Sequence, residues 1–155
     1  MHESIVSFIK KNRENILAPV LEVGSANVNG SIRGECPEPY TGVDLAPGAG
    51  VDVVVGEDDP LPFPDESFRT VISTSMLEHA LDPVACLREM ARVLSPGGLL
   101  LVTAAGNGFN RHNPPDRWRL MPGTLAEWGV RLGLNCQEEE DPQVSGRFLV
   151  AFRAG

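Results

Sequence analysis

The sequence has no long run of apolar residues and few cysteines. No apolar segment approaches the ~20 residues that a membrane-spanning helix needs, and charged residues interrupt the N-terminal segment, which argues against a secretory signal peptide. Cys36, Cys86 and Cys136 lie far apart without a C-x-x-C pair, so neither a disulfide framework nor a zinc knuckle is indicated. We therefore expect a cytoplasmic protein with reduced thiols and no association with a membrane.

Positive charge is also scarce, because 13 Lys and Arg residues stand against 21 Asp and Glu residues, for a net charge of −8. An acidic surface repels phosphate backbones, so we expect no extended contact with nucleic acid. The 155 residues, 42% of them hydrophobic, suffice for one buried core. We expect a single domain over residues 1–155.

Short segments rich in β-branched residues alternate with helical patterns along the chain. The predicted strands are residues 19–24, 40–45, 51–55, 68–75 and 99–105, and a closing hairpin pairs 135–141 with 147–154. Helices are predicted over residues 3–17 and 124–132, and over the segment LDPVACLREMARVLSPGG, which ends at Ser-Pro-Gly-Gly. Asp82 and Pro83 fit the start of that middle helix, and Thr124 with Glu127 forms a capping box for the last one. The alternation predicts an α/β fold with a mostly parallel sheet.

The second and third predicted strands are separated only by APGAG. A parallel crossover normally needs a dozen residues or more, usually a helix. A five-residue linker covers roughly the length of one short strand, because an extended chain spans at most ~3.3–3.6 Å per residue. Two alternatives stay open: residues 51–55 return in parallel without a helix, or they pair antiparallel or only loosely.

Glycine is scarce in the loop after the first strand. The segment GSANVNG does not match G-x-G-x-x-G, which argues against a dinucleotide. Gly24 permits close backbone approach, and Asn27 and Asn29 tolerate the left-handed conformations that glycine usually supplies. Asp44 ends the second strand 20 residues later, where an acid binds the two hydroxyls of a ribose.

Several motifs occur in one order along residues 19–105: VLEVGS, YTGVDL, LPFPDESF, STSMLEH and REMARVLSPGGLLLVT. As a set they resemble class I S-adenosylmethionine-dependent methyltransferases, in particular a compact methyltransferase type 11-like subgroup. The resemblance implies a Rossmann-like, doubly wound sheet of order 3-2-1-4-5-7-6 with the last strand antiparallel. It also implies S-adenosylmethionine as cofactor, and shortened helices between strands 1 and 2 and between strands 2 and 3.

The chain departs from the family pattern at several positions. Ala26 and Asn27 stand where glycines often occur, and Arg69 stands where aspartate is usual. The segment NPPDRWRLMPGTL resembles a P-x-D-Y-W-R segment of related methyltransferases that lies near the acceptor, with Arg117 in place of tyrosine. Residues 106–123 are therefore expected to form a substrate-side loop.

The resemblance implies roles for individual residues. The expected cofactor-binding residues are Glu22, Gly24, Ser25, Asn27, Asn29, Asp44, Leu45, Glu57, Asp58 and Ser75. Glu57 and Asp58 follow the third strand, beside the expected adenine. His79 is the first candidate for a base that takes a proton from the acceptor, with His112 and Asp116 behind it. No metal or covalent intermediate is required.

The long loop also carries Arg117, Trp118 and Arg119. The arginines either hold an anionic acceptor or pair with local acids, and Trp118 is interpreted as a packing anchor. We expect a small-molecule acceptor, a metabolite or saccharide methylated at oxygen or nitrogen, or another exposed acceptor. Apolar surface left by the missing helix suggests a homodimer.

Two other functions compete with methyl transfer. A nicotinamide-dependent oxidoreductase would share Gly24 and Asp44, but it needs a pyrophosphate loop and a proton-handling set, and the single tyrosine, Tyr40, lies inside the second strand. A non-catalytic module that binds S-adenosylmethionine or S-adenosylhomocysteine and acts through a protein partner is consistent with the glycine-poor loop.

Overall fold

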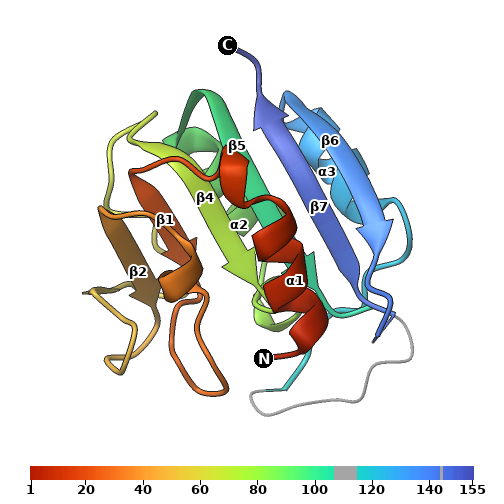
Figure 1. The fold of residues 1–155 in the computed structure, drawn as a ribbon, viewed down its shortest axis with the longest axis horizontal. Helices are drawn as coiled ribbons and strands as arrows, with labels where there is room; N and C mark the ends of the chain where they lie inside the picture. The colour runs from red at the N-terminus through yellow and green to blue at the C-terminus, as the bar shows by residue number, and fades with distance from the viewer. Residues whose placement is uncertain (107–114, 144) are drawn as a thin grey trace.

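Seven strands form one sheet in the order β3-β2-β1-β4-β5-β7-β6, in a computed structural model that describes residues 1–106, 115–143 and 145–155 (Figure 1). The strands are β1 Val20–Val23, β2 Tyr40–Asp44, β3 Val53–Val54, β4 Phe68–Thr74, β5 Leu94–Ala104, β6 Leu134–Glu140 and β7 Arg147–Arg153. Every neighbouring pair is parallel except β7, which runs antiparallel to both β5 and β6. The α/β class, the strand order and the antiparallel last strand are confirmed.

Helices cover both faces of this sheet (Figure 1). They are α1 Glu3–Lys11, α2 Pro83–Val93 and α3 Thr124–Arg131, with short 3₁₀ turns η1 Arg13–Asn15, η2 Arg33–Glu35 and η3 Leu77–His79. α1 packs in a core cluster with alternate residues of the central strands, and α2 and α3 pack in a second cluster on the opposite face. Only η2 lies between β1 and β2, and no helix lies between β2 and β3, as the shortened crossovers predicted.

The first helix is shorter than predicted. The apolar pattern predicted one helix over residues 3–17, but α1 ends at Lys11 and a 3₁₀ turn follows. The side chain of Asn12 donates a hydrogen bond to the Phe8 carbonyl at 2.8 Å, while its backbone N–H bonds to Ile9 instead. Because this side chain takes the carbonyl that the next helical N–H would use, the helix stops there.

The third strand is parallel to β2, which answers the open question about residues 51–55. Only Val53 and Val54 pair, opposite Val43 and Asp44. The return needs no helix because a tight turn, closed by the Val51 N–H on the Gly48 carbonyl at 3.1 Å, reverses the chain directly beside β2. The turn uses residues that the pattern had assigned to the strand, so β3 is shorter than predicted.

The two later helices begin differently. Asp82 caps α2 as predicted, because its carboxylate accepts the Ala85 N–H at 2.9 Å and Pro83 starts the helix. The predicted capping box of Thr124 and Glu127 is wrong. Gly123 is the N-cap in a left-handed conformation, and the Glu138 carboxylate accepts N–H groups of the first turn of α3 from across the fold.

Glu138 is itself fixed by a buried ion pair with Arg147 at 2.7 Å. This ion pair joins α3 to the closing hairpin of β6 and β7. The hairpin was predicted, whereas the ion pair was not. Among the described residues, no helix is long and apolar enough to cross a membrane.

Candidate active site

The strand order reverses between β1 and β4, and ligands of doubly wound sheets bind outside the carboxyl ends of the strands at such a point. Buried side-chain oxygens without a hydrogen-bond partner in the described part of the chain lie here: Ser25 Oγ just after β1, Ser73 Oγ near the end of β4 and Glu78 Oε2 just after β4. Native proteins satisfy nearly all buried polar groups, so a concentration of unpartnered ones indicates a place where a ligand completes the contacts.

The loop after β1 lies against the end of β2. The N–H groups of Gly24 and Ser25 both donate to the Val43 carbonyl, at 2.9 and 3.1 Å, and Gly24 adopts a left-handed φ of 84°. The Asn27 N–H donates to the Ala49 carbonyl at 2.8 Å, and the Asn27 side chain accepts the Gly30 N–H at 3.1 Å. Asn27 thus closes a local turn through its side chain, but neither Asn27 nor Asn29 has a positive φ, so the left-handed conformation expected of them in place of glycine is not adopted.

Two glycines outside this loop make its path possible. A Cβ on Gly42 would lie 2.2 Å from the Gly50 carbonyl oxygen and 2.6 Å from Ser25 Oγ, and a Cβ on Gly50 would lie 2.7 Å from the Ser25 carbonyl oxygen. Ser25 is therefore buried against β2 and the turn before β3. The loop is poor in glycine because the glycines needed for close approach belong to the segments that it touches.

Asp44 ends β2 beside this loop. Its carboxylate accepts the Ala26 N–H at 2.8 Å and the Leu45 N–H at 2.7 Å, one on each oxygen. Each oxygen retains a further position for a hydrogen bond. The half-buried carboxylate is thus held rigidly, with capacity to accept two hydroxyl groups, whereas Leu45 is exposed.

Glu22 lies deeper than the other predicted cofactor residues. It is buried on the α1 face of β1 and accepts a hydrogen bond from the Tyr40 hydroxyl at 2.5 Å. Burial raises its pKa to about 7, and the nearby charge of Asp44 acts in the same direction, while the Tyr40 hydrogen bond acts against it. Glu22 joins β1 to β2 beneath the loop.

The backbone just after β4 is strained. Ser75 has a φ of 51°, unusual for a residue with a side chain, and its N–H donates to the carbonyl and the hydroxyl of Thr103. The side chain of Met76 then lies on Gly24, so that a Cβ on Gly24 would be 2.7 Å from Met76 Cγ. Such outliers cluster at functional sites. Nothing in the sequence pattern had pointed to Met76.

Residues 115–120, here called the strap, dock on the turn after β4. The N–H groups of Arg117 and Trp118 donate to the Glu78 carbonyl at 2.6 and 3.1 Å, and the Trp118 indole N–H donates to the Ala80 carbonyl at 2.8 Å. Leu120 continues this contact at the end of β5 through its N–H on the Ala105 carbonyl. Trp118 anchors the strap as predicted, although its ring remains partly exposed.

The strap brings two predicted catalytic residues together. His79 Nδ1 lies 3.1 Å from Asp116 Oδ1, and Asp116 Oδ2 lies 2.5 Å from Arg119 Nη2. With Nδ1 facing a carboxylate, we assign the proton to Nδ1, which leaves Nε2 of the neutral ring as the proton acceptor. Asp116 is buried and His79 is partly exposed, so the acid orients a ring that a ligand can reach. His112 lies outside the described residues.

The strap also contacts the loop after β3. Arg117 pairs with Glu57 at 3.0 Å and donates to the His79 carbonyl, so both strap arginines pair with local groups rather than standing open for an anion. Glu57 and Asp58 are exposed on this side of the edge. Of the predicted site residues, Gly24, Asn27, Asp44, Glu57, Ser75, His79 and Asp116 lie at the carboxyl ends of the strands or on the strap.

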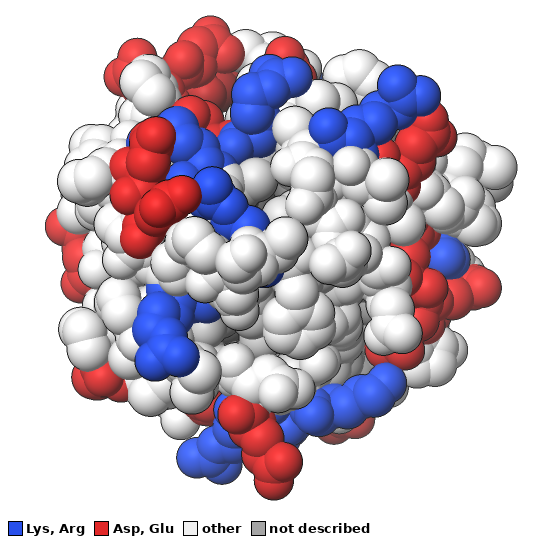
Figure 2. All heavy atoms as spheres, turned by 90° about the horizontal axis from the view of Figure 1, so that it is seen from above, with Lys and Arg blue, Asp and Glu red and all other residues white. Residues whose placement is uncertain are grey.

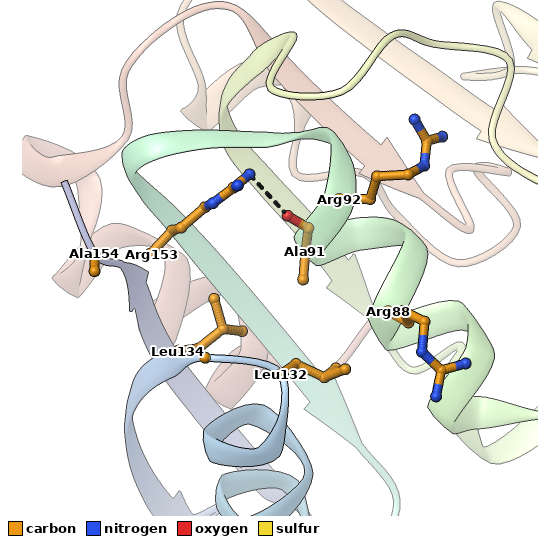
Figure 3. Close-up of a pocket in the computed structure, with 8 residues that line it drawn as sticks. Arg88, Ala91, Arg92, Leu132, Leu134, Arg153 and Ala154 are labelled. Atoms are coloured by element: carbon orange, nitrogen blue, oxygen red, sulfur yellow. Dashed lines mark hydrogen bonds between the residues drawn. The ribbon is translucent and has the colours of Figure 1, made fainter.

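The opposite edge of the sheet, at the amino ends of the parallel strands, contains a hollow lined by arginines. It has a volume of about 420 Å³ and lies between the ends of α2, α3 and β7 (Figure 3). Arg153 donates there to the Ala91 and Leu94 carbonyls, and Arg92 pairs with Glu89 and Asp65. Figure 2 looks onto this edge and shows charges of both signs interspersed. Arg153 thus satisfies carbonyls at the end of α2 and Arg92 is paired with acids, and none of the unpartnered buried oxygens of the described residues lies at this edge.

The carboxyl edge fits the cofactor that the sequence resemblance implies. Asp44 can accept the hydroxyls of a ribose, Gly24 exposes backbone without a Cβ, and Ser25, Ser73 and Glu78 hold unpartnered oxygens around the point where the strand order reverses. An adenosine with an amino-acid tail offers donors and acceptors of the matching kinds.

The methyltransferase domain family matches residues 21–102. The chain is 46% identical over 61 residues to the demethylmenaquinone methyltransferase of Mycobacterium sp. (strain KMS), covering 39% of this chain and 26% of that protein. It is 38% identical over 102 residues to the fatty-acid O-methyltransferase of Mycolicibacterium smegmatis, covering 56% of this chain and 36% of that protein. The chain thus spans about a quarter to a third of the length of these relatives.

Solved structures share the whole fold at low identity. The YcgJ protein from Bacillus subtilis superposes with a TM-score of 0.78 and 13% identity, covering 99% of this chain and 100% of that chain. The Burkholderia thailandensis 1,6-didemethyltoxoflavin-N1-methyltransferase, with S-adenosylhomocysteine bound, superposes with a TM-score of 0.71 and 15% identity, covering 97% and 77%. The family match and the fold together show that the chain belongs to the S-adenosylmethionine-dependent methyltransferases, with S-adenosylmethionine as its cofactor.

Proposed function

We propose that this chain methylates an oxygen or nitrogen atom of a small or exposed acceptor, such as a metabolite or a saccharide. The observation that carries the proposal is the contact between His79 and Asp116 at the same edge as the cofactor residues. When bound, S-adenosylmethionine supplies a methyl group on a sulfonium, open to in-line displacement by a nucleophile. The protein's part is to bind, orient and exclude water.

In this proposal, different residues bind different parts of the cofactor. Asp44 accepts the ribose hydroxyls, and Glu57 and Asp58 accept from the exocyclic amine of adenine. The backbone of Gly24 and Ser25 lies under the amino-acid part, with Ser75 opposite across the strand ends. Asn27, Asn29 and Leu45 line the outer side of the loop, and Glu22 supports the loop from below through Tyr40.

His79 is the base in this proposal. Its Nδ1 lies 3.1 Å from Asp116 Oδ1 and 3.4 Å from the Pro115 carbonyl oxygen, so the proton is placed on Nδ1, and Nε2 takes the proton that an attacking hydroxyl or amine loses. Arg119 holds the second oxygen of Asp116 and so keeps the carboxylate aimed at the ring. A base of this kind contributes about 10²–10⁴-fold to a rate.

The names of two related proteins are consistent with oxygen and nitrogen acceptors, whereas other relatives are carbon or tRNA methyltransferases. One relative is an O-methyltransferase and one structural neighbour is an N1-methyltransferase with a small-molecule substrate. The site also lies at a strand edge spanned by the strap.

The test begins with calorimetric titration of S-adenosylhomocysteine, with NADH as the control ligand. We expect micromolar binding of S-adenosylhomocysteine alone. Product formation is then measured with S-adenosylmethionine and a panel of monosaccharides and small amines, and His79→Gln should lower turnover about 10²-fold or more at unchanged S-adenosylhomocysteine affinity.

Two results would change this proposal. Binding without transfer to any acceptor, together with a stable protein partner in pull-downs, would replace this proposal with the non-catalytic module. Transfer that His79→Gln leaves intact would retain the reaction and remove the assigned base.

A further inference from the structure

Glu78 is a buried acid at the junction of the strap, η3 and the end of β5. Its residue exposure is 3%. Its carbonyl accepts the two strap N–H groups, and the backbone N–H groups of Ala105 and of Glu78 itself lie near its carboxyl group. Carboxyl oxygen Oε2 has no hydrogen-bond partner among the described residues. Oε2 is therefore a buried oxygen that the described part of the chain leaves without a hydrogen bond.

The other charged groups around this junction are engaged. Arg117 binds Glu57 and the His79 carbonyl, and Arg119 binds Asp116 and the Trp118 carbonyl. Asp116 contacts His79 as well. Among the described residues, the hydrogen-bonding capacity left unmet here belongs to an acid, so an ionised Glu78 would take a donor or a cation as its partner.

We propose that Glu78 recognises an amino group of the acceptor and that this group binds there as an ammonium ion. The inference rests on the proposed function, because it takes the region beside the strap and His79 to be the acceptor's. A buried carboxylate is costly unless a positive charge compensates it, and a neutral hydroxyl would supply a hydrogen bond but no charge. An ammonium supplies both.

The electrostatics of the junction agree with this assignment. Burial raises the pKa of Glu78, and the neighbouring Asp116 charge acts in the same direction against an opposing effect of His79. Without a ligand the group therefore holds its proton more readily than an exposed glutamate. Binding an ammonium favours the ionised form, so binding should release a proton to the buffer.

Matched probes test the inference directly. Ethylamine with ethanol, and benzylamine with benzyl alcohol, are titrated into the protein saturated with S-adenosylhomocysteine. We expect each amine to bind at least tenfold more tightly than its alcohol, with a heat that depends on the ionisation enthalpy of the buffer. Glu78→Gln, which keeps the size of the side chain, should weaken amine binding at least fivefold and leave the alcohols unchanged.

The controls test the role of Glu78 separately from the proposed function. Glu139→Gln removes one exposed charge elsewhere and should leave amine binding within twofold of the wild type. The melting transition of Glu78→Gln shows whether the variant is folded. The amines are also titrated without S-adenosylhomocysteine, so that amine recognition is measured even if the cofactor product fails to bind.

Three outcomes would overturn the inference. The first is alcohols that bind as tightly as amines, and the second is no amine binding at all. The third is a Glu78→Gln variant that loses affinity for S-adenosylhomocysteine, which would make Glu78 a cofactor residue. Failure of S-adenosylhomocysteine to bind the wild type would instead count against the proposed function.

Discussion

The two sides of the carboxyl edge are held together by different contacts. On the cofactor side, the loop after β1 is held by backbone hydrogen bonds to Val43 and Ala49 and by close contacts at Gly42 and Gly50. On the proposed acceptor side, η3 and the strap share backbone hydrogen bonds at the Glu78 carbonyl, and side chains add a second set of contacts, with His79, Asp116 and Arg119 in one chain of charged groups.

This difference separates two kinds of constraint. A backbone contact specifies a shape and tolerates many side chains, provided that no Cβ intrudes at the crossing points. A side-chain contact specifies chemistry, because one substitution changes charge and hydrogen bonding without moving the chain. The cofactor side is thus suited to one invariant ligand, and the acceptor side can be altered residue by residue.

The largest expected effect comes from adding one carbon to the cofactor side. Gly42→Ala places a Cβ 2.2 Å from the Gly50 carbonyl oxygen, so the loop must shift. We expect a loss of about 3 kcal/mol in unfolding free energy, measured by urea denaturation, and loss of S-adenosylhomocysteine binding. Gly48→Ala, in the turn between β2 and β3 with nothing within 4 Å of the new carbon, should stay within about 0.5 kcal/mol of the wild type. Equal effects of the two variants would contradict the backbone account.

The next effect is a pH dependence from Glu22 beneath the loop. Its pKa is raised from 4.5 to about 7 in the folded protein, so between these values the unfolded chain ionises while the native group keeps its proton. Stability should therefore fall as the pH rises through this window, by about 3 kcal/mol at 1.36 kcal/mol per unit, and stay level above it.

Glu22→Gln removes that titration while retaining an acceptor for Tyr40. We expect the variant to match the wild type near pH 4 and to be more stable above pH 7, in urea denaturation at several pH values. Glu14→Gln, an exposed acid, is the matched control and should keep the wild-type slope. Parallel curves for wild type and Glu22→Gln would show that Glu22 does not carry the pH dependence.

A smaller loss is expected at Asp44. Asp44→Asn keeps an oxygen for the Ala26 N–H but loses one acceptor for a ribose hydroxyl. A hydrogen bond to a charged group is worth ~1.5–3 kcal/mol, so S-adenosylhomocysteine should bind roughly ten- to a hundredfold more weakly by calorimetry. Asp65→Asn, which lies in an exposed ion pair with Arg92, should bind like the wild type. Unchanged affinity in Asp44→Asn would remove Asp44 from the cofactor site.

The smallest effect is expected for the ion pair that links the two sides. Arg117 and Glu57 are both partly exposed, so Arg117→Ala should lower the free energy of unfolding by less than about 1 kcal/mol. It should change the affinity for S-adenosylhomocysteine less than about fivefold. The difference in stability between the variant and the wild type should shrink at high salt. Arg131→Ala breaks a similar exposed pair with Glu127 and should leave the affinity unchanged. A loss above tenfold in Arg117→Ala would mean that the strap supports cofactor binding directly.

Much of the fold could be predicted because its signals are local. Apolar spacing and β-branched runs located the strands, and Asp82 with Pro83 located the start of α2. The errors arose where a distant or competing group intervened. Asn12 ended α1 early through a side-chain bond, and Glu138 replaced the capping box of α3 from another strand.

The candidate site was predictable in part. The resemblance pointed to Asp44, His79 and Asp116 as separate residues, and the structure shows His79 and Asp116 in contact. Glu78 and Met76 were missed because an acid or a methionine beside a turn has no distinctive pattern. Their importance comes from what surrounds them, an unpartnered buried oxygen in one case and a glycine contact in the other.

The sequence by itself determined most of the secondary structure, the α/β class and the family, because each depends on residue types at short spacings along the chain. Only the tertiary structure decided that Gly42 and Gly50 make room for a loop poor in glycine, and that the strap sets Asp116 against His79. These contacts join segments far apart in the chain. Their geometry follows from strand order and packing, which short-range patterns do not encode.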